Sequence, residues 1–147
     1  MNKSNRFLFS FIGLILFQIF MSLEELTGGY PQFIKIVTQK IHIRIPSIPV
    51  IEISNQLFMF SNLIIIIILF VFLGLVFTET KWSGILAIIL GIIEILNGAF
   101  HIISSIHFKM YIPGTISAIG LIIFGFLIIF IRPSFQEEET EKTPETQ

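Results

Sequence analysis

The sequence predicts an all-α, polytopic membrane protein, a single bundle of four transmembrane helices with a short interfacial segment between the first two. Hydrophobic residues make up 54% of the 147 residues and the mean hydropathy is +0.89, which is more apolar surface than a soluble domain of this length can bury. Four apolar stretches approach the roughly 20 residues that cross a bilayer core of about 30 Å. We place one domain at 1–135, with spans at about 6–26, 56–77, 83–105 and 114–131.

The first span is expected to be a retained helix. Lys3 and Arg6 precede the apolar run Phe7–Phe20, a pattern that signal peptides share, but no small-x-small cleavage pattern follows the run. Gly28-Gly29 and Pro31 are expected to end the helix, because glycine and proline interrupt helical backbone.

The segment between the first two spans mixes apolar and basic residues. Residues 32–40 place Phe33, Ile36 and Val37 among lysines, a pattern typical of a short helix lying on the bilayer surface. Residues 42–53 alternate isoleucine with polar residues and contain two prolines, which predicts an extended loop or part of a lid.

The remaining spans carry helix-boundary signals. Ser54 and Asn55 are candidate caps of the second span, Trp82 is a candidate interface anchor of the third, and Pro113 suits the first helical position of the fourth. The tail 136–147 is acidic and polar, which predicts disorder.

The distribution of basic residues favours an orientation in the cell membrane with both termini in the cytoplasm, by five basic residues inside against four outside. The net charge of −1 gives no indication of nucleic-acid binding, and the absence of cysteine excludes disulfides and thiolate chemistry. The basic residues would divide as Lys3, Arg6, Lys81, Arg132 and Lys142 inside, against Lys35, Lys40, Arg44 and Lys109 outside.

The third span carries an ionisable residue in its interior. Glu94 would lie about 18 Å beyond Trp82 at the helical rise of about 1.5 Å per residue. A charge at that depth costs roughly 2.5–3.5 kcal/mol on insertion scales, which marks Glu94 as a candidate site residue. Asn97 and His101 share its helix face.

Antiparallel spans bring further polar residues to the same membrane side. Gln18, Met21, Glu24 and Glu25 end the first span, and Tyr111 precedes the fourth. Adjacent helical residues diverge by about 100°, so we expect one glutamate of the pair to face inward and the other outward. The pattern predicts a one-sided polar funnel, deepest at Glu94, with Tyr111 at its rim.

Three motifs occur in order along these spans: Met21–Glu25, Asn97–His101 and Tyr111–Gly114. They resemble the HxxEE, NxxxH and YxPG signatures of the HXXEE-domain integral membrane proteins, and the step Gly28–Pro31 is similar to that family too. The resemblance covers roughly Phe7 to Ile131 and implies a membrane-embedded active site without naming a substrate. It also implies a histidine where this chain has Met21.

The chemistry of these residues leaves several functions open. Glutamates and His101 are ligand types suited to zinc, iron or manganese, but the thioether of Met21 is a soft ligand and carries no proton, so both the metal and the cofactor stay unknown. An acid–base site that acts on a lipid-like molecule by hydrolysis or isomerisation needs fewer functional groups than a metal site does. The candidate site residues are Glu24, Glu25, Glu94, Asn97, His101 and Tyr111.

Two alternatives to an enzyme remain. A non-catalytic binding or partner subunit is favoured by Met21, and a transporter subunit is disfavoured because Leu8–Phe17 and Gly84–Ile93 offer almost no polar lining. Each residue also has a structural interpretation: Glu94 as a buried carboxyl bonded to Asn97, His101 as an interfacial side chain, and Tyr111 as an aromatic-belt residue. The oligomeric state is not determined by the sequence.

Overall fold

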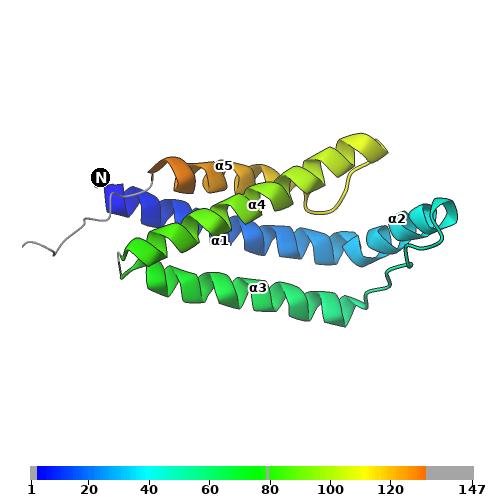
Figure 1. Ribbon diagram of the computed structural model, residues 1–147, viewed down its shortest axis with the longest axis horizontal. Coiled ribbons are helices and arrows are strands. Elements are labelled where there is room, and N and C mark those ends of the chain that lie inside the picture. The colour runs from blue at the N-terminus through cyan, green and yellow to red at the C-terminus, as the bar shows by residue number, and fades with distance from the viewer. Residues whose placement is uncertain (1–2, 79, 132–147) are drawn as a thin grey trace, which may run out of the picture.

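The computed structural model describes residues 3–78 and 80–131, and the described chain is helical apart from its connecting loops (Figure 1). The all-α prediction is therefore confirmed. The tail 136–147 lies outside the described residues. In chain order, the helices are α1 (Lys3–Gly28), α2 (Tyr30–Arg44), α3 (Asn55–Val76), α4 (Lys81–Phe108) and α5 (Thr115–Ile131).

Three of these helices are long and apolar enough to cross a membrane, namely α1, α3 and the Trp82–Phe108 part of α4. The fourth expected span, α5, is a shorter apolar helix of 17 residues. Several apolar helices of this kind indicate a membrane protein.

Helices α1, α3, α4 and α5 lie alongside one another (Figure 1). Helix α5 packs against both α4 and α1, and α3 packs mainly on α1. Helix α2 and the α4–α5 loop lie at one end of the bundle, and the start of α1 and the end of α5 lie at the other (Figure 1). The end of α1, the end of α4 and the start of α5 therefore meet at one end, as antiparallel spans predict.

The segment between α1 and α3 forms a longer helix than the predicted 32–40. Gly29 adopts a left-handed backbone (φ 75°) that separates α1 from α2, and Pro31 sits in the first turn, where no N–H is needed. The helix continues to Arg44, so the extended segment starts only at Ile45. The loop then folds back, because the Thr38 hydroxyl accepts the Ile51 N–H at 3.1 Å.

The boundary signals were partly correct. Ser54 caps α3, with its hydroxyl accepting the Leu57 N–H at 3.2 Å, and Thr80 caps α4 in the same way. Pro113 does not occupy the first helical position of α5. Gly114, with φ 98°, stands between Pro113 and the helix, because the chain must turn there before Thr115.

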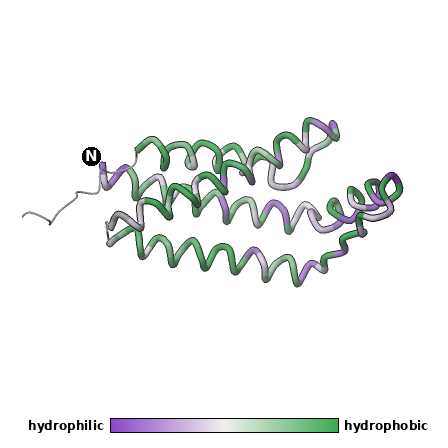
Figure 2. The backbone as a smooth tube through the Cα atoms, viewed as in Figure 1, coloured by the Kyte–Doolittle hydropathy of each residue, from purple (hydrophilic) through white to green (hydrophobic). Residues whose placement is uncertain are grey.

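Polar and apolar side chains occupy different halves of the bundle. Figure 2 shows that the hydrophilic residues of α1 and α3 gather in the half nearer α2, apart from the first turn of α1. Most of the buried apolar residues lie in the other half: Phe7, Phe11, Leu14, Ile15, Leu69, Val76, Ala87, Leu121 and Ile128. The polar residues therefore lie toward one end of the bundle.

Helices α4 and α5 approach closely at glycines, as small residues allow in membrane bundles. A Cβ on Gly98 would lie 2.8 Å from the Ala118 carbonyl oxygen, and a Cβ on Gly125 would lie 2.8 Å from that of Gly91. Gly91 and Gly98 thus allow α4 to pack closely on α5. This contact also fixes the rotation of α4, and with it the direction in which the polar face of α4 points.

We expect Gly98→Val to separate α4 from α5 and to destabilise the bundle by about 1–3 kcal/mol, because backbone atoms cannot yield as a side chain can. Gly74→Val is the matched control, since a Cβ there meets nothing within 4 Å. Thermal unfolding in detergent measures the difference. Equal midpoints for the two variants would contradict this account of the α4–α5 contact.

Candidate functional site

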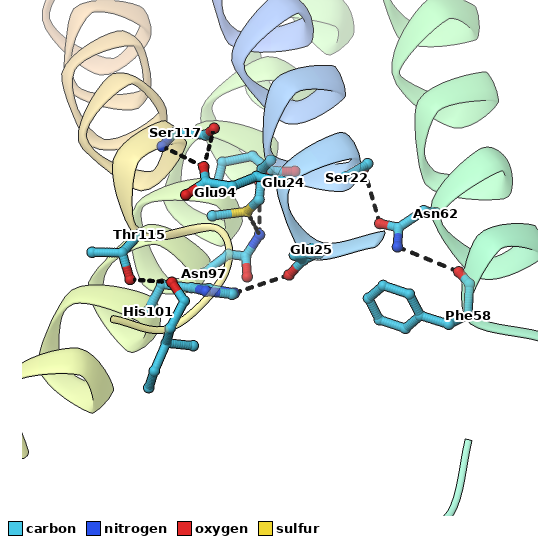
Figure 3. Close-up of polar contacts among 12 residues, drawn as sticks. Ser22, Glu24, Glu25, Phe58, Asn62, Glu94, Asn97, His101, Thr115 and Ser117 are labelled. Atoms are coloured by element: carbon cyan, nitrogen blue, oxygen red, sulfur yellow. Dashed lines mark hydrogen bonds and ion pairs between the residues drawn. The ribbon is translucent and has the colours of Figure 1, made fainter. Parts of the chain in front are cut away.

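The two adjacent glutamates at the end of α1 face different helices (Figure 3). Glu25 is buried against α4, where it contacts His101, and half-buried Glu24 contacts the start of α5. Their divergence follows from the rotation of about 100° between neighbouring helical residues. Glu25 faces inward as expected, and the more exposed Glu24 binds donors at the start of α5.

Glu25 and His101 form a buried pair. A Glu25 carboxylate oxygen lies 3.1 Å from His101 Nε2, and both side chains are almost fully enclosed. A carboxylate only accepts hydrogen bonds, so this contact places a proton on Nε2. The other ring nitrogen, Nδ1, is buried and has no hydrogen-bond partner among residues 3–78 and 80–131. For neutral His101, the free lone pair is therefore on Nδ1.

The His101 ring is held on two further sides. Tyr30 stacks on it, with ring centroids 5.0 Å apart and planes 26° apart. Gly114 lies beside the ring edge, and a Cβ there would come within 2.7 Å of both Nδ1 and Cε1. The left-handed glycine thus lets the α4–α5 loop close over the imidazole. A carboxylate, an aromatic ring and a loop together fix the orientation of the ring.

Tyr30 was not among the predicted site residues. Burial, together with the neighbouring Glu25 carboxylate, raises the pKa of Tyr30 to about 12. Its hydroxyl therefore stays protonated at physiological pH, and its part at His101 is to stack rather than to act as a base. The only signal in the sequence was its position directly after the Gly28-Gly29 break, which places an aromatic ring at the turn over the end of α1.

Glu94 and Asn97 lie deeper along the same face of α4. The Asn97 amide nitrogen donates to a Glu94 carboxylate oxygen and contacts the Met21 sulfur, both at 3.4 Å. Glu94 is buried, and the hydrogen bond anticipated in its structural interpretation is present. One turn before Met21, the buried Gln18 has a side-chain oxygen that no described residue contacts through a hydrogen bond. The seam between α1 and α4 is therefore polar from Gln18 to His101.

Glu24 and Tyr111 form a separate group at the start of α5. The two Glu24 oxygens accept the backbone N–H groups of Ile116 (3.2 Å) and Ser117 (3.1 Å), the Ser117 hydroxyl (2.6 Å) and the Tyr111 hydroxyl. The two backbone N–H groups belong to the first turn of α5, where an N-cap side chain usually accepts them. A negative charge at this helix start also complements the helix dipole. Glu24 thus joins the end of α1 to the start of α5. Ser117 was not singled out in the sequence, because a serine inside an apolar helix gives no sign of a partner on another helix.

A second polar contact joins α1 to α3. The Ser22 hydroxyl donates to the Asn62 side-chain oxygen at 3.0 Å, and the Asn62 amide donates to the Phe58 carbonyl at 3.3 Å (Figure 3). No set of three His, Cys, Asp or Glu side chains that could hold a metal converges in the part of the chain that the structure describes. Since Glu24 turns away toward α5, the four predicted ligand residues do not form one cluster.

Residues 11–129 match a family model described as "Protein of unknown function with HXXEE motif". The match covers most of the chain, and the chain belongs to this family, as the three motifs suggested. No curated protein and no solved structure matches the chain.

We expect Glu24→Ala to loosen the start of α5 and to lower stability by about 0.5–2 kcal/mol, the usual effect of losing a cap. Thr27→Ala is the control, because within the described ranges the Thr27 hydroxyl donates only to carbonyls of its own helix. Hydrogen exchange in detergent should show faster exchange at the amides of Ile116 and Ser117 in Glu24→Ala alone. Unchanged exchange at these two amides would show that Glu24 does not cap α5.

Proposed function

We propose that this member of the HXXEE family is a small intramembrane enzyme that performs acid–base chemistry on a lipid-like substrate, by hydrolysis or isomerisation. The observation that supports this most strongly is the buried Glu25–His101 pair, in which no described residue is a hydrogen-bond partner of the imidazole Nδ1. A histidine held through one nitrogen by a carboxylate, with the other nitrogen free, is the arrangement of a general base and its orienting group.

Each residue of the seam has a role in this proposal. His101 Nδ1 takes a proton from water for hydrolysis, or from a substrate carbon for isomerisation, and Glu25 stabilises the imidazolium that results. Glu94, seven residues deeper on the same helix face, supplies a second proton-exchanging group, and Asn97 orients its carboxyl. Because Nδ1 lies against Gly114, the substrate reaches it when the 109–114 loop moves aside.

The membrane arrangement belongs to the same proposal. We place four spans in the cell membrane, with α5 as the fourth, since 17 residues rise about 25 Å and lie at the short end of the spanning range. Both termini lie in the cytoplasm, which puts the polar seam near the outer leaflet. The start of α1 and the end of α5 at one end of the bundle support a common side for the termini (Figure 1).

A pocket is favoured over a transport path. Beyond the seam the interior is filled by Phe11, Leu14, Leu121 and Ile128, all fully buried. The buried Ser10 there bonds back to a carbonyl of its own helix and offers nothing to a passing solute. Polar groups that stop at mid-bundle fit a site open to one side.

A non-catalytic binding subunit is the second candidate. The observation that favours it is the contact of Met21 with Asn97, which puts a thioether inside the polar seam. A thioether cannot carry a proton. If the first position of the family's motif is a working histidine, this chain keeps the fold and has lost one proton carrier.

Glu25→Gln and His101→Asn should each lower turnover by at least about 100-fold, because general acid–base groups contribute roughly 10²–10⁴ to rate. The purified protein in proteoliposomes of total membrane lipid extract provides the assay, with products measured by mass spectrometry. Glu52→Gln is the charge-matched control, since Glu52 pairs with Lys35 at the surface. Wild-type turnover in folded Glu25→Gln and His101→Asn protein would disprove the assignment.

Met21→His distinguishes the two candidates. In an enzyme, an imidazole beside Asn97 adds a proton carrier to the seam, so we expect the same lipid assay to give faster turnover than wild type. In a binding subunit, neither the wild type nor Met21→His turns over any lipid of the extract. Turnover that falls in well-folded Met21→His protein would show that the thioether is itself needed.

A further inference from the structure

A half-open groove lies between α2 and the α4–α5 loop, outside the polar seam. Its volume is about 350 Å³, within the roughly 300–1,000 Å³ of small-molecule sites. Its walls are mainly apolar, with Phe33, Ile36 and Val37 from α2 facing Phe108, Met110 and Pro113. An apolar trough of this shape suits a hydrocarbon chain.

Only one loop separates the groove from the Glu25–His101 pair. Tyr111 lines the groove and donates its hydroxyl to Glu24. Pro113 also lines it and packs on Gly28, where a Cβ would come within 2.5 Å of the proline ring. The next residue, Gly114, lies against the His101 ring. A molecule in the groove therefore lies next to the loop that covers His101 Nδ1.

The groove carries one cation that no described carboxylate neutralises. Lys40 lines it, and no ion pair joins Lys40 to another residue of the described ranges, whereas Lys35 pairs with Glu52 at 2.7 Å. None of the described residues that line the groove is acidic. An apolar trough with a positive charge complements an amphiphile whose head group is negative.

We propose that this groove binds a single-chain lipid with an anionic head group, taken from the surrounding membrane. The acyl chain lies along the apolar faces of α2 and the α4–α5 loop, and the head group pairs with Lys40. This inference rests on the proposed function in identifying the bound lipid as the substrate of the Glu25–His101 pair. The binding itself requires no catalysis.

Native mass spectrometry of the full chain, released from a non-ionic detergent, tests the binding with oleate as the probe. We expect one oleate per wild-type chain. Lys40→Glu reverses the charge and Val37→Trp fills the trough, and each should weaken binding at least tenfold. Oleyl alcohol, which has the same chain and no charge, should also bind at least tenfold more weakly than oleate.

The matched controls lie on the same helix and do not line the groove. Arg44→Glu reverses a neighbouring charge and Ile43→Trp enlarges an exposed side chain, so both should bind oleate as the wild type does. Oleate binding that is equal in Lys40→Glu, Val37→Trp and their controls would overturn the inference. Equal binding of oleyl alcohol would overturn the role of Lys40.

The two proposals fail in different ways. Glu25→Gln should still bind one oleate, because Glu25 does not line the groove. If groove variants bind oleate normally while Glu25→Gln abolishes turnover, the groove inference is wrong and the proposed enzyme stands. If oleate binding depends on Lys40 while Glu25→Gln turns over lipid normally, the groove stands and the catalytic assignment is wrong.

Discussion

The structure depends on one constraint: a polar side chain inside an apolar bundle must find its partner within the protein, because hydrocarbon offers none. At the end of α1, two adjacent glutamates find their partners on two different helices. Glu25 contacts His101 of α4, and Glu24 accepts the first amides of α5. Since α1 and α4 otherwise have few close backbone contacts, side-chain contacts across their seam are the principal link between them.

This arrangement gives the two glutamates unequal freedom to take part in chemistry. Glu24 accepts two backbone amides of the first turn of α5 and the Tyr111 hydroxyl of the preceding loop, so moving it would release amides at a helix start. Glu25 orients an imidazole whose second nitrogen is uncommitted. The contacts that hold the fold and those that fit an acid–base site therefore come from neighbouring residues but remain separable.

The α4–α5 loop lies between the buried Glu25–His101 pair and the apolar groove. Its left-handed Gly114 brings backbone against His101, its Tyr111 bonds to Glu24, and its Pro113 packs against Gly28 at the end of α1. A side chain at position 114 would push the loop off the ring. The loop thus covers the imidazole and also forms one wall of the apolar groove beside α2. A shift of the loop at the groove therefore also shifts the backbone that covers His101.

Much of this protein follows from local sequence properties. Apolar run lengths identified the helices, the Gly-Gly-Tyr-Pro step marked the end of α1, and antiparallel order placed Glu24, Glu94, His101 and Tyr111 toward one end, because hydropathy, backbone preference and chain reversal act over short distances. Which helix each glutamate faces, the stacking of Tyr30 on His101, the cap that Glu24 provides for α5 and the place of Gly114 were decided only by the tertiary structure. The rotation of α4 about its axis depends on how it packs against α5 at Gly98 and Ala118, and no local pattern carries that information.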